Sequence, residues 1–171
     1  MKAWLPALLR LAVLALLVVF ITSPSWFEPL LKPLTENGAP AIYNQGSLLT
    51  LTLQHLRIVL IATVAATIVA VALAILVTRP AGAEFLPLSR SLVNIGQTFP
   101  PVAVLALAVP AVGFGEKPTL IALFLYGLLP IFENALTALT TLPGNVMEAA
   151  RGAGMTGWQR LMKVELPLSA P

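Results

Sequence analysis

Residues 56–77 read LRIVLIATVAATIVAVALAILV, and this stretch decides the fold because it carries no charge after Arg57. A helix needs about 20 mostly apolar residues to cross the hydrocarbon layer of a bilayer. Ala and Thr recur along the stretch, and such small residues let helices approach closely in lipid. It is followed by TRPAG at residues 78–82, a charge with two helix breakers. We therefore predict a membrane-spanning helix from Leu56 to Val77.

The composition of the whole chain agrees with a membrane protein. Of 171 residues, 58% are hydrophobic and only 10% are charged, whereas soluble domains carry about 25% charged residues. The ten Lys and Arg residues are scattered singly, which argues against nucleic-acid binding because that function needs a clustered basic face. Cysteine and aspartate are absent and His55 is the single histidine, so we expect no metal site.

Three further apolar stretches are long enough to span a bilayer. They run from about Trp4 to Ile21, from about Ser91 to Val112 and from about Thr119 to Leu139. The first stretch is either a retained anchor or a cleaved secretory signal, for which Lys2 and Arg10 supply the positive region.

The four stretches predict an all-α, polytopic bundle of transmembrane helices. Residues 1–22 form the anchor or signal, and residues 23–47, rich in proline and glycine, form an extracytoplasmic loop. Residues 48–171 form the main membrane domain. We expect residues 113–118 (GFGEKP) to be a tight polar turn between the third and fourth spans.

The basic residues predict the orientation of these spans. With the N-terminus inside, three basic residues fall on the outer side, namely Lys32, Arg57 and Lys117. Seven fall on the cytoplasmic side, namely Lys2, Arg10, Arg79, Arg90, Arg151, Arg160 and Lys163. This distribution obeys the positive-inside rule. The segment after residue 140 is therefore expected to face the cytoplasm, with or without cleavage of the first segment.

Several polar residues and prolines fall inside the predicted spans, namely Asn94, Gln97, Pro100, Pro101, Pro130 and Glu133. Prolines at membrane depth leave backbone carbonyls without a partner in their own helix, and bent helices of this kind suit a gated pathway. The alternative is that proline is merely tolerated and that the polar groups lie near the cytoplasmic interface. Glu133 is either a structural residue paired with a basic side chain or a proton relay.

Residues that carry catalysis are missing from the sequence. It has no phosphate-binding loop, no nucleophile elbow, no zinc-binding HExxH pattern and no dinucleotide fingerprint. We therefore expect no catalytic residue, no metal site and no cofactor in this chain. If the protein takes part in energised transport, another subunit must bind the nucleotide.

Residues 148–167 read EAARGAGMTGWQRLMKVELP. They predict two short helices, Val146–Arg151 and Trp158–Val164, with glycines between them and Pro167 as the end of the unit. Four residues of the second helix share one predicted contact face, namely Trp158, Leu161, Met162 and Glu165. The pair of helices is either a docking element for a partner or a loop resting on lipid headgroups.

The same stretch resembles the coupling loop of ABC-type importer permeases. Their pattern is EAA, three residues, Gly, nine residues, an aliphatic residue, one residue and Leu-Pro. The matching residues are Glu148, Ala149, Ala150, Gly154, Val164, Leu166 and Pro167. The resemblance implies a type I permease bundle in which residues 140–167 dock on a cytoplasmic ATPase and transmit its motion to the membrane helices.

Residues 48–171 resemble the osmoprotectant branch of these permeases, most closely at QTFPP (97–101) and YGLLP (126–130). The resemblance implies an inner-membrane subunit that imports glycine betaine, choline or carnitine by alternating access. Its implied partners are the ATPase, a second copy or paralogue, an extracytoplasmic substrate-binding protein and the lipid bilayer, without nucleic acid. Glu133-Asn134 departs from the basic-Asn pair of that branch.

Two alternatives to an osmoprotectant permease stay open. The chain could be a membrane assembly protein that recruits a cytoplasmic partner without transport, or a permease for another solute such as an amino acid. The family resemblance also implies at least two more spans after the coupling loop. We therefore expect this chain to be a piece of a longer permease or a truncated product.

Overall fold

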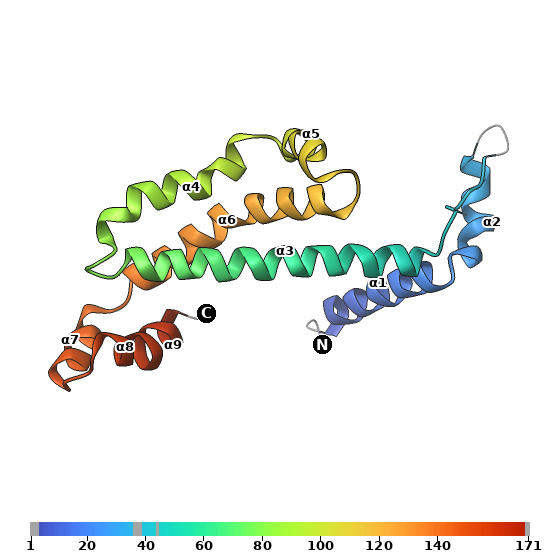
Figure 1. Cartoon of the computed structure of the whole chain (residues 1–171). Helices are drawn as coiled ribbons and strands as arrows, with labels where there is room; N and C mark the ends of the chain where they lie inside the picture. Colours follow the sequence, from blue (N-terminus) through green and yellow to red (C-terminus); the bar gives the residue numbers. More distant parts are fainter. Residues whose placement is uncertain (1–3, 36–38, 44, 170–171) are drawn as a thin grey trace. The chain divides into compact units, whose positions relative to one another are not determined.

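The computed structural model describes residues 4–35, 39–43 and 45–169, and every regular element among them is helical (Figure 1). The chain divides into two compact units, Met1–Arg57 and Ile58–Pro171. Lys2, which contributed to the predicted orientation, lies outside the described residues.

The first unit begins with the helix predicted at its start. Helix α1 spans Trp4–Thr22 and is followed by three short helical turns, η1 (Pro24–Phe27), α2 (Glu28–Leu31) and η2 (Lys32–Leu34). The helical direction bends by 108° between α1 and these turns, at a proline that cannot donate a backbone hydrogen bond. The rings of Phe20 and Phe27 meet edge to face across the bend, with centroids 5.2 Å apart. The start of the predicted loop 23–47 is thus helical.

Helix α3 (Leu48–Val77) begins eight residues before the predicted span. Five of the eight residues before Leu56 are Leu or Gln, which favour helix, and this extends α3 at its start. Four alanines spaced four residues apart share one buried face, namely Ala62, Ala66, Ala70 and Ala74. Leu60 and Ile68 are exposed elsewhere on the helix, each by 65%. One face of α3 therefore packs closely while the rest presents apolar side chains outward.

The predicted third span, Ser91–Val112, is formed by a bent pair of helices rather than by one straight helix. Helix α4 (Leu86–Thr98) and helix α5 (Pro101–Val112) are separate and bent by 93° from each other. Phe99 between them is extended, with φ −109° and ψ 140°, because a residue before proline is disfavoured in the helical region. Pro101 then starts α5, where its missing N–H is not needed.

Helix α6 (Glu116–Thr140) starts three residues before the predicted Thr119. The negative charge of Glu116, in the first turn, is favourable at the positive end of the helix dipole. Pro118 also fits the first turn, because the first N–H groups of a helix have no helical partner. Helices α4 and α5 both pack on α6 (Figure 1). The core joins Phe132 and Leu128 of α6 to Val93 of α4 and to the alanine face of α3.

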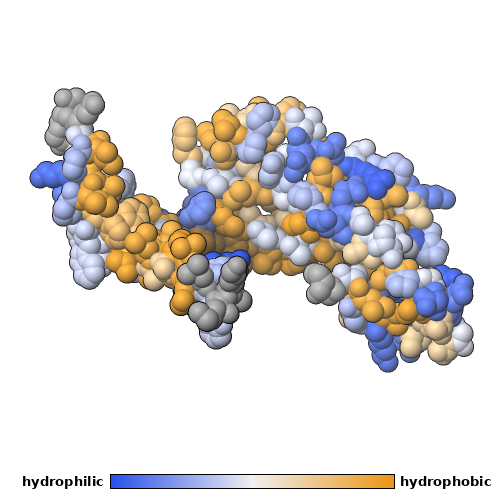
Figure 2. Space-filling view, turned by 180° about the vertical axis from the view of Figure 1, so that it is seen from behind, coloured by the Kyte–Doolittle hydropathy of each residue, from blue (hydrophilic) through white to orange (hydrophobic). Residues whose placement is uncertain are grey.

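Among the described residues, two helices, α3 and α6, are each long and apolar enough to cross a membrane, and the number reaches four if each bent pair counts as one span. Large apolar side chains are exposed on many of the described helices. Figure 2 shows hydrophobic residues over much of the visible surface, with more hydrophilic residues toward the end of the second unit that carries α4 and the last helices. Such extensive apolar exposure is typical of a surface covered by lipid or by other helices.

The last part of the second unit contains helix α7 (Gly144–Gly152), helix α8 (Gly157–Arg160), a π-helical turn (Leu161–Glu165) and helix α9 (Leu166–Ser169). We call residues 144–169 the EAA segment. Both predicted short helices are present, but the second continues past Pro167. The expectation that Pro167 ends the unit is wrong, since α9 follows the π-helical turn without a break and continues to Ser169.

Candidate functional site

The end of α7 explains the glycine in the EAA segment. Gly154 has φ +74°, a left-handed conformation that costs other residues energy. Its N–H donates to the carbonyl of Arg151 at 3.0 Å, and the N–H of Met155 donates to the carbonyl of Ala150 at 3.2 Å. This pair of bonds is a Schellman motif, which ends a helix and redirects the chain. Gly154 therefore fixes the direction in which the chain leaves α7.

Helix α8 starts with a reciprocal pair of hydrogen bonds. The hydroxyl of Thr156 accepts from the backbone N–H of Gln159 at 3.2 Å, and the side-chain oxygen of Gln159 accepts from the N–H of Thr156 at 2.9 Å. This capping box satisfies two N–H groups that have no helical partner. The glycine turn and the capping box together define the angle between the two halves of the EAA segment.

The predicted contact face of the second half is divided between two directions. Leu161 and Glu165 are buried, with 4% and 3% of their surface exposed. Trp158 and Met162 are exposed by 68% and 49%. The four residues therefore do not form one docking face. Leu161 and Glu165 are buried within the second unit, whereas Trp158 and Met162 remain available to a partner. On α7, Glu148 and Ala149 are exposed, while Ala150 is buried.

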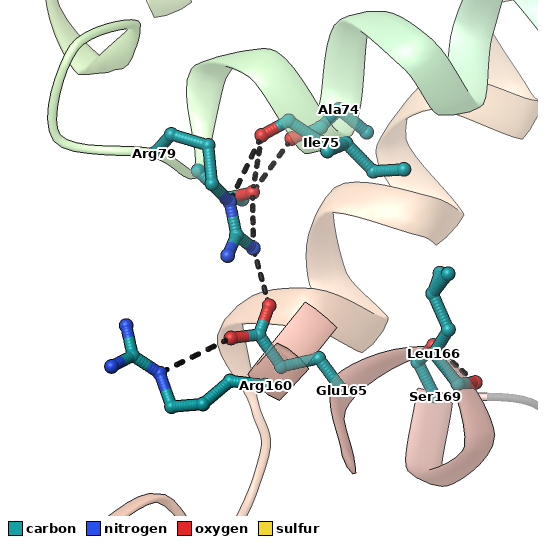
Figure 3. Close-up of polar contacts among 8 residues, drawn as sticks. Ala74, Ile75, Arg79, Arg160, Glu165, Leu166 and Ser169 are labelled. Atoms are coloured by element: carbon teal, nitrogen blue, oxygen red, sulfur yellow. Dashed lines mark hydrogen bonds and ion pairs between the residues drawn. The ribbon is translucent and has the colours of Figure 1, made fainter. Parts of the chain in front are cut away.

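The buried carboxylate of Glu165 forms an ion pair with the guanidinium of Arg79, which follows the end of α3 (Figure 3). A second guanidinium, that of Arg160, lies 4.0 Å from the other carboxylate oxygen, measured to its Nε. Burial of a charge is costly unless it is paired. The two arginines therefore make the burial of Glu165 possible.

Arg79 is itself held by groups at the end of α3. Its Nε donates to the carbonyl of Ile75 at 3.3 Å, and its terminal nitrogen donates to the hydroxyl of Thr78 at 3.2 Å. The chain then turns back so tightly that a methyl group on Gly82 would lie 2.1 Å from the carbonyl oxygen of Leu76. Because the last carbonyls of a helix are partly negative, a cation at this position is favourable.

A cavity of about 360 Å³ lies beside this ion pair, and its lining includes Arg79, Arg151 and Arg160 together with Glu165. The ends of α3 and α6 also contribute to the lining. Three of the basic residues predicted on the cytoplasmic side thus lie at one end of the second unit.

The contact between α4 and α6 contains a second group of candidate residues. In a regular helix the N–H of residue 130 would donate to the carbonyl of residue 126, but Pro130 has no N–H. The side-chain amide of Gln97 donates to this carbonyl of Tyr126 at 2.9 Å. Gln97 thus satisfies the carbonyl that Pro130 leaves without a helical donor, which connects two of the predicted pathway residues.

Gly96 permits this hydrogen bond. It is buried in α4, and a methyl group at its position would lie 2.1 Å from the carbonyl oxygen of Leu125 in α6. The backbones of the two helices can approach this closely because Gly96 has no side chain. Gln97, the next residue, then reaches the carbonyl of Tyr126.

Glu133 pairs with Arg90, which is the structural alternative considered for this carboxylate. The Nε and a terminal nitrogen of Arg90 donate to the two carboxylate oxygens at 2.9 and 3.2 Å. The side chains are 52% and 38% exposed, respectively. Asn94 lies exposed on α4, and Pro100 and Pro101 lie at the break before α5. The role of these residues in a transport pathway stays a prediction.

Sequence reasoning missed the Arg79–Glu165 pair and the close approach at Gly96. Arg79 and the EAA segment were placed on the same side of the membrane, and that was the available signal for an ion pair between them. Gly96 stands directly before a polar residue in a predicted span, which is a weaker signal. Neither signal specifies which elements meet.

The arrangement is that of a helical membrane protein with apolar helices of spanning length and a structured polar segment at one end. Residues 70–171 match the family described as binding-protein-dependent transport system inner membrane component. The chain therefore belongs to this family of multi-pass inner-membrane proteins. This confirms the predicted all-α fold class, the recognised family and the interpretation as a transport component rather than an enzyme.

Among curated proteins, the chain is similar to osmoprotectant import permease protein OsmY of Salmonella typhimurium, with 44% identity over 127 residues. It is also 44% identical over 131 residues to glycine betaine/carnitine/choline transport system permease protein OpuCB of Bacillus subtilis, and 42% identical over 127 residues to carnitine transport permease protein OpuCB of Listeria monocytogenes. These matches cover 74–75% of this chain and 54–58% of the relatives. No solved structure shows significant similarity to the chain.

Proposed function

We propose that this chain is part of the permease subunit of an ATP-binding cassette importer for a quaternary ammonium osmoprotectant. The observation that carries the proposal is the EAA pattern, with every spacing matched, within the residues that belong to the transport family. ATP hydrolysis would take place on a separate cytoplasmic subunit, and the permease would move its solute by alternating access.

The EAA segment would be the contact with the ATPase. Glu148 and Ala149 are exposed on α7, and Trp158 is exposed on α8, so these side chains are available to a groove on the partner. Gly154 would set the angle between α7 and α8. The half-buried Val164 and Leu166 would hold the second half against the membrane helices, and the exposed Pro167 would lie in α9 beside them. The excess of basic residues at this end supports a cytoplasmic location.

The names of the relatives support a proposal for the solute, and the family supports a proposal for the remaining partners. Their names refer to osmoprotectants, glycine betaine, carnitine and choline. We infer that a second copy or a paralogue of the permease completes the pathway and that an extracytoplasmic binding protein delivers the solute. A quaternary ammonium group would be recognised there chiefly by cation–π contacts.

The contact between α4 and α6 would contribute to the pathway. The carbonyl of Tyr126 accepts its hydrogen bond from a side chain on another helix, and the helical structure is interrupted at Phe99 and Pro100, between α4 and α5. Irregular backbone of this kind suits a helix pair that rearranges between two states. Asn94 of α4 and Glu133 of α6 would be further polar groups of the pathway on the same two helices.

The function is tested by uptake of labelled glycine betaine, choline, carnitine and a polar amino acid into proteoliposomes that contain the complete transporter. We expect ATP-dependent uptake of at least one quaternary ammonium compound. Glu148→Ala should weaken ATPase binding and uptake together, while Asn145→Ala on the same helix should preserve both.

Three results would contradict parts of the proposal. ATP-dependent uptake of the amino acid alone would exclude an osmoprotectant permease but retain an importer. Loss of ATPase binding in Glu148→Ala with unchanged uptake would favour an assembly protein. Accessibility of the EAA segment to a protease added outside sealed cells would exclude a cytoplasmic location.

A further inference from the structure

Glu165 is the most deeply buried charged residue among those described, with 3% of its surface exposed. It lies in the π-helical turn, not in the part of the EAA segment that carries the exposed Trp158. A buried carboxylate without a partner would cost several kcal/mol. The position of Glu165 therefore depends on the cations that face it.

The two cations that face Glu165 belong to different elements. Arg79 follows α3 and forms the direct ion pair, whereas Arg160 belongs to α8 within the EAA segment itself. Hydrogen bonds to Ile75 and Thr78 orient Arg79. Arg160 is more distant, at 4.0 Å. Of the two cations, Arg79 is therefore the one that joins Glu165 to a residue outside the EAA segment.

Among the described residues, the EAA segment is connected to α6 both through the chain and through the packing of α9 on α6, and the ion pair connects it to Arg79 after α3. Residues 141–143 link it covalently to the end of α6. The ion pair links its second half to the end of α3. The two partners, Arg79 and Glu165, are 86 positions apart in the sequence. A displacement of the segment can therefore act directly on α6, but it can act on α3 only through contacts such as this ion pair.

We propose that the Arg79–Glu165 ion pair transmits displacement of the EAA segment to α3. The proposal rests on the proposed function, in which a partner ATPase moves this segment. The π-helical turn supports it, because a wider turn changes the direction of the side chains that follow, and such turns occur often at functional sites. Arg79 and Glu165 are positioning residues that contact neither nucleotide nor solute.

The test measures the movement of α3 and α6 separately. This chain has no cysteine, so Leu76→Cys, near the end of α3, and Thr137→Cys, near the end of α6, can each be its single labelled position in the complete transporter, with any cysteines of the other parts replaced. Both side chains are exposed. In the otherwise unchanged protein, ATP should alter the labelling rate at both positions.

Glu165→Gln and Arg79→Gln should each reduce the ATP-dependent change at position 76 about fivefold, as expected for loss of a coupling of ordinary strength. The change at position 137 should persist because α6 is linked covalently. The amount of solute transported per ATP hydrolysed should fall together with the ATP-dependent change in labelling rate at position 76. Arg79→Lys keeps the charge and should preserve most of the response, which separates loss of the ion pair from loss of folding.

Arg90→Gln provides a matched control, because it removes an arginine–carboxylate pair in the same unit but outside the EAA segment. It should leave the response at position 76 unchanged. The proposal is overturned if Glu165→Gln leaves both responses intact, or if it abolishes both in a complex that still binds the ATPase. Absence of any ATP-dependent change in the unsubstituted protein would contradict the proposed function, and the inference would fall with it.

Discussion

The contact between α4 and α6 and the contact between α3 and the EAA segment solve different problems with different chemistry. In the first, Gly96 brings two backbones together and a neutral side chain, Gln97, satisfies a carbonyl left open by Pro130. In the second, a buried carboxylate meets arginine. The first contact joins α4 to α6, an apolar helix of spanning length in which an unpaired backbone group is costly. The second lies at the end of α3, where long charged side chains can be accommodated.

The two contacts are therefore sensitive to different kinds of substitution. The α4–α6 contact depends on shape, because its hydrogen bond requires a short distance between the helices. The contact of the EAA segment depends on charge, because Glu165 remains buried only while a cation faces it. A third contact, the half-exposed Arg90–Glu133 pair, allows the role of burial to be isolated.

The largest expected effect is that of removing the buried carboxylate. Glu165→Ala leaves Arg79 without its ion-pair partner and should lower the free energy of unfolding by about 3–5 kcal/mol. Glu133→Ala removes a carboxylate that is 38% exposed and should lower it by less than about 1 kcal/mol. Chemical denaturation in detergent micelles measures both. Equal effects of the two substitutions would show that burial does not distinguish the pairs.

A smaller effect is expected when the helices of the first contact are forced apart. Gly96→Ala places a methyl group against the carbonyl of Leu125 and should cost about 1–3 kcal/mol by overpacking. Gly152→Ala is the control, since a methyl group there meets nothing within 4 Å, and it should be neutral or slightly stabilising. A neutral Gly96→Ala would contradict the close approach of α4 to α6.

The hydrogen bond of the first contact can be tested by restoring the donor that proline lacks. Gln97→Leu leaves the carbonyl of Tyr126 unsatisfied and should cost about 1–2 kcal/mol. Pro130→Ala supplies an N–H within α6, so the double substitution should be more stable than Gln97→Leu alone. Thermal unfolding of the single and double variants forms a double-mutant cycle. Additive effects would exclude the pairing of these two features.

The most local effect concerns the turn within the EAA segment. Gly154→Ala forces a side chain into the left-handed region and should cost about 1–2 kcal/mol, confined to this segment because nothing packs on the glycine. Hydrogen exchange should increase in residues 144–160 and remain unchanged in α6. An increase that extends to α6 would mean that the segment is not a separate local element.

Apolar length and the positions of breakers predicted most of the helices, because these features act locally. Helix α1 ends at Thr22, one residue beyond the prediction, and α6 ends at Thr140. The size of the bend in the third predicted span could not be derived from hydropathy, because Phe99-Pro100-Pro101 is apolar enough to continue a span but cannot continue a helix. The two adjacent prolines are the local signal for the bend, but they do not specify its angle.

The candidate site was predictable only where its pattern is contiguous. The EAA pattern lies within 20 residues, and Gly154 indeed occupies a turn that favours glycine. The pairing of Arg79 with Glu165 joins residues 86 positions apart, and nothing in a single sequence specifies that register. For Gln97, the sequence indicated that Pro130 would leave a carbonyl open but not which side chain would reach it.

The dependence of Tyr126 on Gln97 has a consequence for biogenesis. Helix α6 alone would enter the bilayer with one bare carbonyl, and each such group in lipid costs several kcal/mol. Helix α4 is synthesised earlier and carries the amide that satisfies this group. The two helices are thus expected to leave the insertion machinery as a pair, so that the order of the segments along the chain also provides the order of their assembly.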